Sequence, residues 1–130
     1  MTFAEPRFSL SEWRLDDRTA IASVRGEIHV STAPELNDAL TEALVSGPTN
    51  LVVDLTAVEF IDSTGLSVLL SALRQVTRAG GRMPVVCRNP TVLRLFEITQ
   101  LDRTFDLHAD LDAALTALQP DAGASNSGAP

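Results

Sequence analysis

The residues best placed to do chemistry form a short run, Asp62-Ser63-Thr64-Gly65, between a strand-like stretch and an apolar helical stretch. Asp62 is a natural helix N-cap, because its carboxylate can accept hydrogen bonds from the unpaired N–H groups of a first turn. Ser63 and Thr64 each bring a hydroxyl to that turn. Gly65 has no side chain, so we expect another surface to approach the backbone closely there. An ordinary helix start is the simplest interpretation, and a modified or docking site is the alternative.

Enzymatic interpretations of Ser63 fit poorly. A hydrolase nucleophile elbow reads G-x-S-x-G, and the residue two before Ser63 is Ile61. An aspartic protease loop needs a contiguous Asp-Ser/Thr-Gly, whereas an additional residue lies here between Ser63 and Gly65. The two histidines, His29 and His108, are remote in sequence and offer no nearby base. We therefore expect no enzyme, and a small serine hydrolase is the least favoured hypothesis.

Composition excludes further classes of protein. All ten basic residues among the 130 are arginine, and lysine is the residue that P-loops and kinase folds place on ATP phosphates. A phosphoaspartate receiver would also need a lysine. One cysteine and two isolated histidines offer no metal-ligand spacing. We therefore expect neither a metal ion nor another cofactor.

The charge and the apolar pattern bear on partners and location. The net charge of −7 argues against nucleic acid or an anionic membrane surface as the main partner. No apolar run approaches the ~20 residues of a membrane span, and the first ten residues do not resemble a signal peptide. Cys87, the single cysteine, is expected to be a small buried strand residue, with a redox sensor as the alternative. These features predict a cytoplasmic protein.

Phosphorylation is a reaction that Ser63 could undergo without loss of the fold. A phosphoserine carries roughly −1.5 to −2 charges, and a helix N-terminus tolerates negative charge. If the surface around Ser63 docks a partner, the new charge would be buried beside Asp62. Burying an unpaired charge at an interface costs about 2–5 kcal/mol. The run could therefore act as a switch.

The elements that must position this run alternate along the chain. The pattern predicts a hairpin over 8–15 and 19–30 and further strands over 51–55, 83–87 and 104–107. Helices are expected after Thr32, Asp62, Asn89 and Asp110, and Thr32 and Glu35 have the spacing of a capping box. This order predicts a single α/β domain, a mixed four- to five-stranded sheet with about four helices packed on it.

The domain is expected to span residues 1–119, and 120–130 to form a disordered tail because they are small, polar and broken by glycine and proline. Charge is uneven within the domain, since residues 61–101 hold five arginines and two acids. Arg74 and Arg78 share one helix face four residues apart. A solvated face is the simpler interpretation, and a partner-binding patch is the other.

The segment from Leu51 to Arg74, LVVDLTAVEFIDSTGLSVLLSALR, closely resembles the signature of STAS domains of the anti-sigma factor antagonist type. The similarity extends to Gly26-Glu27-Ile28 before an Ala-Pro helix start, to Gly80-Gly81, and to the NPTVLRLF segment over 89–96. The fold of that family is a mixed sheet with helices. A lysine-free, arginine- and alanine-rich composition also suggests a bacterial source with high GC content.

The resemblance implies partner switching in transcription regulation, in stress response or development. In that family the unphosphorylated protein binds an anti-sigma factor that is a serine kinase, which frees a sigma factor. The kinase phosphorylates the serine after the aspartate, the complex dissociates, and a serine phosphatase resets it. Carried onto this chain, Ser63 is the phosphate acceptor, with Thr64 as second choice. His29, Asp62, Ser63, Thr64 and Gly65 are the expected partner-binding residues.

One departure and one alternative stay open. Family members commonly read Gly-Glu-Leu/Ile-Asp, and this chain has His29 where the aspartate stands. Drift at an exposed loop explains this most simply, while a change in the accepted kinase, or pH sensitivity, is the other interpretation. The alternative function is a STAS docking subunit of a sensor or lipid-transport complex, without phosphorylation. The sequence leaves the oligomeric state and the packing of Trp13 undecided.

Overall fold

A computed structural model describes residues 8–45 and 47–119. The strands are β1 (Phe8–Arg14), β2 (Thr19–Ile28), β3 (Asn50–Ile61), β4 (Pro84–Val86) and β5 (Asp106–His108). The helices are α1 (Ala33–Val45), α2 (Ser63–Arg78), α3 (Pro90–Ile98), the short 3-10 helix η1 (Leu101–Arg103) and α4 (Leu111–Ala117). The predicted tail over 120–130 lies outside the described residues.

The five strands form one sheet in the order β1-β2-β3-β4-β5. β1 pairs with β2 antiparallel, and the other three pairs are parallel. A helical connection links each parallel pair, as right-handed crossovers require. This mixed sheet with four helices confirms the predicted α/β class. The carboxyl ends of β2 and β3 are in register, Ile28 beside Ile61, so the loops after them leave the sheet together.

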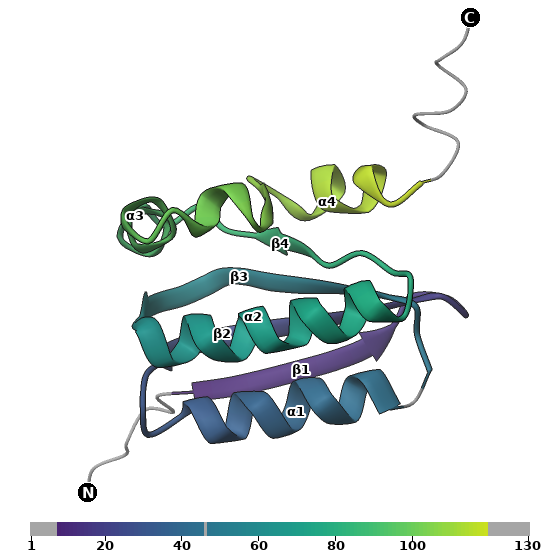
Figure 1. The fold of residues 1–130 in the computed structure, drawn as a ribbon, viewed down its shortest axis with the longest axis horizontal. Helices are drawn as coiled ribbons and strands as arrows, with labels where there is room; N and C mark the ends of the chain where they lie inside the picture. Colours follow the sequence, from purple (N-terminus) through teal and green to yellow (C-terminus); the bar gives the residue numbers. More distant parts are fainter. Residues whose placement is uncertain (1–7, 46, 120–130) are drawn as a thin grey trace, which may run out of the picture.

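Two hydrophobic cores lie on opposite faces of the sheet, because side chains alternate along each strand. The larger core packs α1, α2 and α3 on one face, and Figure 1 shows α1 and α2 side by side across the strands. The smaller core packs Ala114 of α4 against Ile21, Val52 and Val86. Trp13 of β1 pairs with Ile21 of β2 and is 44% exposed, so it is a surface residue.

Several boundaries differ from the predicted ones. β3 is twelve residues long, well beyond the predicted 51–55, since it continues along β2 through two register shifts. In its later part Val58 and Ile61 are buried and Glu59 and Phe60 are exposed, because a register shift between Gly26 and Glu27 interrupts the two-residue alternation. β4 is shorter than the predicted 83–87, and β5 lies two residues later than the predicted start at 104.

The predicted capping box at the start of α1 is wrong. The Thr32 hydroxyl points back along the chain, where it accepts from the His29 N–H at 3.0 Å and donates to the Glu27 carbonyl at 2.8 Å. Thr32 therefore closes the turn after β2. The predicted caps at Asn89 and Asp110 are confirmed, with their side chains accepting from Thr91 N–H and Ala113 N–H.

Candidate functional site

The start of α2 is held by the side chain of the residue before it. Asp62 Oδ1 accepts from the Thr64 N–H at 2.9 Å and from the Gly65 N–H at 3.1 Å, which confirms the predicted N-cap. The Asp62 N–H donates to the Ile28 carbonyl at 3.1 Å, which ties the helix start to the end of β2. The turn is therefore anchored from beneath and its geometry does not depend on Ser63.

Ser63 is the first residue of α2, and it is exposed. Its hydroxyl makes no hydrogen bond to any of the residues that the structure describes. Thr64 is half-buried, so its hydroxyl is the less accessible of the two. A reagent approaching this turn from solvent therefore meets the Ser63 oxygen first.

Gly65 is buried, and another surface does approach its backbone closely. A β-carbon placed on Gly65 would lie 2.5 Å from Ile28 Cγ2 and 2.8 Å from Ile61 Cγ1. The close approach is therefore internal, between α2 and the ends of β2 and β3. Gly65 shapes the turn from below and does not form its outer surface.

His29 follows the end of β2, directly beside the backbone that accepts from Asp62. Its Nδ1 accepts from the Ser31 N–H at 3.2 Å, and its Nε2 lies 3.5 Å from Glu27 Oε1. The side chain is half-buried. The structure thus brings His29 and the Asp62–Gly65 turn to the same edge of the sheet.

Two exposed apolar residues at this edge escaped the sequence analysis. Val30 is 68% exposed in the turn after β2, and Phe60 is 42% exposed near the end of β3. Strict alternation from buried Val58 would have turned Phe60 inward, and the register shift opposite Gly26 and Glu27 turns it outward instead.

Comparison with known proteins identifies the fold family. The model of the STAS domain matches residues 12–114, which is most of the chain. The chain belongs to the STAS domain family.

Its relatives include proteins named for a regulatory role. The anti-sigma-F factor antagonist RsfB of Mycobacterium tuberculosis is 37% identical over 100 residues, which cover 77% of this chain and 81% of RsfB. An anti-sigma-B factor antagonist of Staphylococcus aureus is 32% identical over 90 residues, which cover 69% of this chain and 83% of that protein.

Solved structures agree with this STAS assignment. The crystal structure of an anti-sigma factor antagonist from Mycobacterium paratuberculosis has a TM-score of 0.80 and 37% identity, over 89% of this chain and 98% of that one. The unphosphorylated form of the antagonist SpoIIAA has a TM-score of 0.73, over 84% of this chain and 95% of that one. Its identity is 18%, so it shows the shared fold alone.

The remaining chemical groups of this STAS domain are held in structural roles. Burial raises the pKa of the Cys87 thiol to about 11, against a smaller lowering by the Asn89 backbone. The thiol is therefore protonated at neutral pH, and the structural interpretation of Cys87 is favoured. His108 Nε2 lies 3.0 Å from Asp106 Oδ1 on β5. In the described ranges neither histidine donates to or accepts from Ser63.

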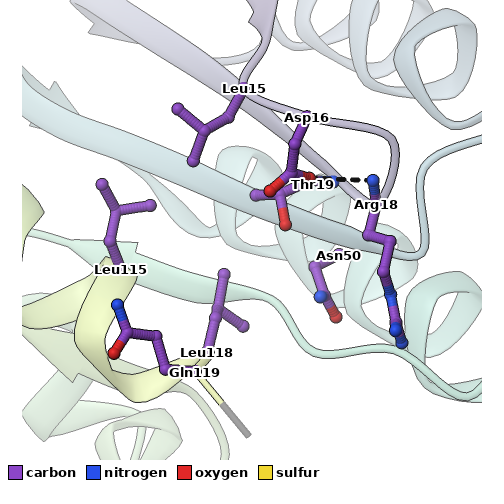
Figure 2. Close-up of a pocket in the computed structure, with 8 residues that line it drawn as sticks. All are labelled: Leu15, Asp16, Arg18, Thr19, Asn50, Leu115, Leu118 and Gln119. Carbon is purple, nitrogen blue, oxygen red and sulfur yellow. Dashed lines mark hydrogen bonds between the residues drawn. The ribbon is translucent and has the colours of Figure 1, made fainter.

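A cavity of about 320 Å³ lies at the amino ends of β2 and β3, remote from the start of α2 (Figure 2). Leu115 and Leu118 form its apolar wall at the end of α4. Asp16 accepts from the N–H groups of Arg18 at 2.8 Å and Thr19 at 2.9 Å, so this acid stabilises the β1–β2 turn.

Metal and membrane sites were sought over residues 8–45 and 47–119. Within these ranges no three His, Cys, Asp or Glu side chains gather closely enough to hold a metal ion. No helix described there combines the length and the apolar character that crossing a membrane demands.

Proposed function

We propose that this STAS domain is an anti-sigma factor antagonist whose unphosphorylated form binds an anti-sigma factor serine kinase and so releases a sigma factor. Phosphorylation of Ser63 abolishes that binding. The observation that carries the proposal is the exposed, unbonded hydroxyl of Ser63 on a turn that Asp62 holds independently. The names of the relatives in Mycobacterium and Staphylococcus support the same role.

The modification is a phosphoryl transfer from ATP bound to the kinase. The Ser63 oxygen attacks the γ-phosphorus, the bond to the β-phosphate oxygen breaks, and ADP leaves. The hydroxyl proton passes to a base of the kinase. This chain needs only to present the oxygen, which fits the absence of lysine from its sequence. A serine phosphatase would hydrolyse the phosphoester and restore the binding form.

The capping by Asp62 explains why a phosphate here would act as a switch. Asp62 already accepts from the N–H groups of Thr64 and Gly65, so those donors do not neutralise a phosphate on Ser63. The added charge therefore stays on the surface beside a carboxylate. A partner docked over Ser63 would bury it, at about 2–5 kcal/mol, which is a loss of tens to thousands in affinity.

Exposed apolar residues beside the turn supply a docking surface. Val30 and Phe60 are exposed and lie, like His29 and Ser63, near the carboxyl ends of β2 and β3. We expect the partner to contact His29, Asp62, Ser63 and Thr64, with Gly65 acting from beneath. We place this action in the cytoplasm of a bacterial cell, where sigma factors work.

The anti-sigma factor kinase is first isolated from native cells by affinity purification on the immobilised Ser63→Ala variant and is then produced recombinantly. The test is a binding titration of this chain with the recombinant kinase. Ser63→Ala should bind as wild type does without ATP, and should stay bound when ATP is added. Ser63→Glu should bind at least about 30-fold more weakly. Thr64→Val is the matched control and should keep the wild-type response to ATP. Equal affinities of Ser63→Ala and Ser63→Glu would contradict the switch and leave a docking-only STAS subunit.

His29 is proposed to tune partner choice. His29→Asp restores the side chain that the family resemblance leads us to expect and changes the charge beside the docking surface. We expect its relative affinities across a panel of purified anti-sigma factors to differ from those of the wild type. Unchanged relative affinities would mean that His29 is a neutral replacement at an exposed loop and has no role in partner choice.

A further inference from the structure

A second surface lies on the opposite half of α2, where a groove of about 570 Å³ runs between this helix and η1. Leu70, Leu73 and Leu101 line its apolar floor, and each is partly buried against the larger core. Arg74 and Arg78 stand at its border, and no acidic residue lines it. The groove is thus an apolar channel with a basic rim.

The two arginines are not used by the fold. Both are exposed, and neither makes an ion pair or hydrogen bond to a residue in the described ranges. They belong to the basic segment 61–101 of a chain whose net charge is −7. Glu97 of α3 and Asp102 of η1 are exposed and lie outside the lining. Exposed arginines beside partly buried leucines are typical of recognition surfaces.

We propose that this groove docks an acidic amphipathic helix of a partner protein. Arg74 and Arg78 are one helical turn apart, about 6 Å along the axis, and this matches carboxylates spaced four residues apart on a helix lying alongside. The leucines of the groove would receive the apolar stripe of that helix. Thr77 and Thr104 add hydroxyls that can donate to the same carboxylates.

A second copy of this chain fits the groove less well. The acidic stripe of α1, formed by Glu35, Asp38 and Glu42, is exposed and could face the arginines. However, Val45 is the exposed large apolar residue of α1, so that helix offers no stripe for the leucines. Helix α1 of a second copy is therefore a poorer match for the groove than an acidic amphipathic helix of another protein.

This surface is independent of the phosphorylation proposed above. Ser63 and Arg74 are separated by eleven residues of α2, about 17 Å along the helix axis. A phosphate on Ser63 therefore does not reach the groove. The groove can fail its test while the Ser63 switch stands, and the reverse also holds.

The probe is an end-capped helical peptide of four turns, with leucines along one face and glutamates one turn apart at the border of that face. The control peptide has the same composition in an order that spreads both residue types around the helix. Each is titrated into the full-length, isotope-labelled chain and followed by amide chemical shifts. Shifts should centre on Leu70, Leu73, Arg74 and Leu101, with affinity that falls as salt is raised.

The double variant Arg74→Gln/Arg78→Gln should bind the patterned peptide with about tenfold lower affinity. Arg88→Gln combined with Arg94→Gln removes two other exposed arginines and should leave the affinity unchanged. Circular dichroism checks that both variants are folded. Equal binding of the two peptides, absence of binding, or shifts centred elsewhere would overturn the proposal. So would sedimentation that shows a dimer lost on Arg74→Gln/Arg78→Gln, since the groove would then hold a second copy.

Discussion

The two ends of α2 are built differently. At the amino end a side chain, Asp62, satisfies the backbone N–H groups and leaves Ser63 at the surface. At the carboxyl end the backbone satisfies itself, with Gly80 N–H donating to the Thr77 carbonyl and Gly81 N–H to the Val76 carbonyl. The first arrangement uses a side chain as the cap and leaves the neighbouring hydroxyl free to be modified, whereas the second uses no side chain. Stability and regulation are therefore separated along one helix.

The largest effect on stability is expected from Gly81→Ala. A β-carbon there would lie 1.7 Å from the Thr49 carbonyl oxygen, which is backbone and cannot rotate away. We expect a loss of about 3 kcal/mol or more in the free energy of unfolding, measured by urea titration. Gly80→Ala is the matched control, because it meets no atom within 4 Å and adds only the strain of φ +85°, about 1 kcal/mol. A smaller loss at Gly81 than at Gly80 would contradict this picture of the carboxyl end.

Gly65→Ala should come next. Its β-carbon would meet Ile28 Cγ2 and Ile61 Cγ1, which are side-chain atoms that can move. We expect a loss of about 1–3 kcal/mol, read from the same urea titrations. Ser67→Ala, at an exposed position one turn or less away, should change little. If Gly65→Ala were stabilising, the gain in helix propensity would outweigh the contact and the site would not be tightly packed.

The sequence predicts the local part of this architecture and misses the part that depends on distant neighbours. Asp62, Asn89 and Asp110 were recognisable as caps, because a cap acts within three residues of itself. Burial of Gly65 could not be predicted, since Ile28 lies far from it in sequence and meets it only through strand pairing. The outward orientation of Phe60 also depends on the pairing of β3 with β2. The groove at Leu101 forms only because the fold places α2 beside η1.

Asp62→Ala should have a moderate effect at the amino end. Removal of the cap leaves the N–H groups of Thr64 and Gly65 without their acceptor, which should lower the free energy of unfolding by about 1 kcal/mol. Asp62→Asn retains an acceptor oxygen, so its free energy of unfolding should fall by less than that of Asp62→Ala. Urea titration of both variants checks this order. Equal losses would mean that the charge, and not the hydrogen bonds, stabilises the turn.

The smallest effect on stability is expected at Ser63 itself. Ser63→Ala and Ser63→Glu should each change the free energy of unfolding by less than about 0.5 kcal/mol, because the side chain is exposed and unbonded. Urea titration and circular dichroism check this together. A loss comparable to that of Gly65→Ala would mean that the phosphorylated state is also a destabilised one, and the two ends of α2 would no longer differ as described.

The central claim is that Ser63 is a regulated phosphate acceptor. Its most direct test is intact-mass analysis with site mapping on this chain, purified from its native cells during growth and under stress. Ser63→Ala, expressed at the same level, is the control. The account predicts one phosphoryl group on Ser63, in a fraction that changes with condition and vanishes in the variant. A chain that carries no phosphate on Ser63 in any condition while a partner remains stably bound would contradict it.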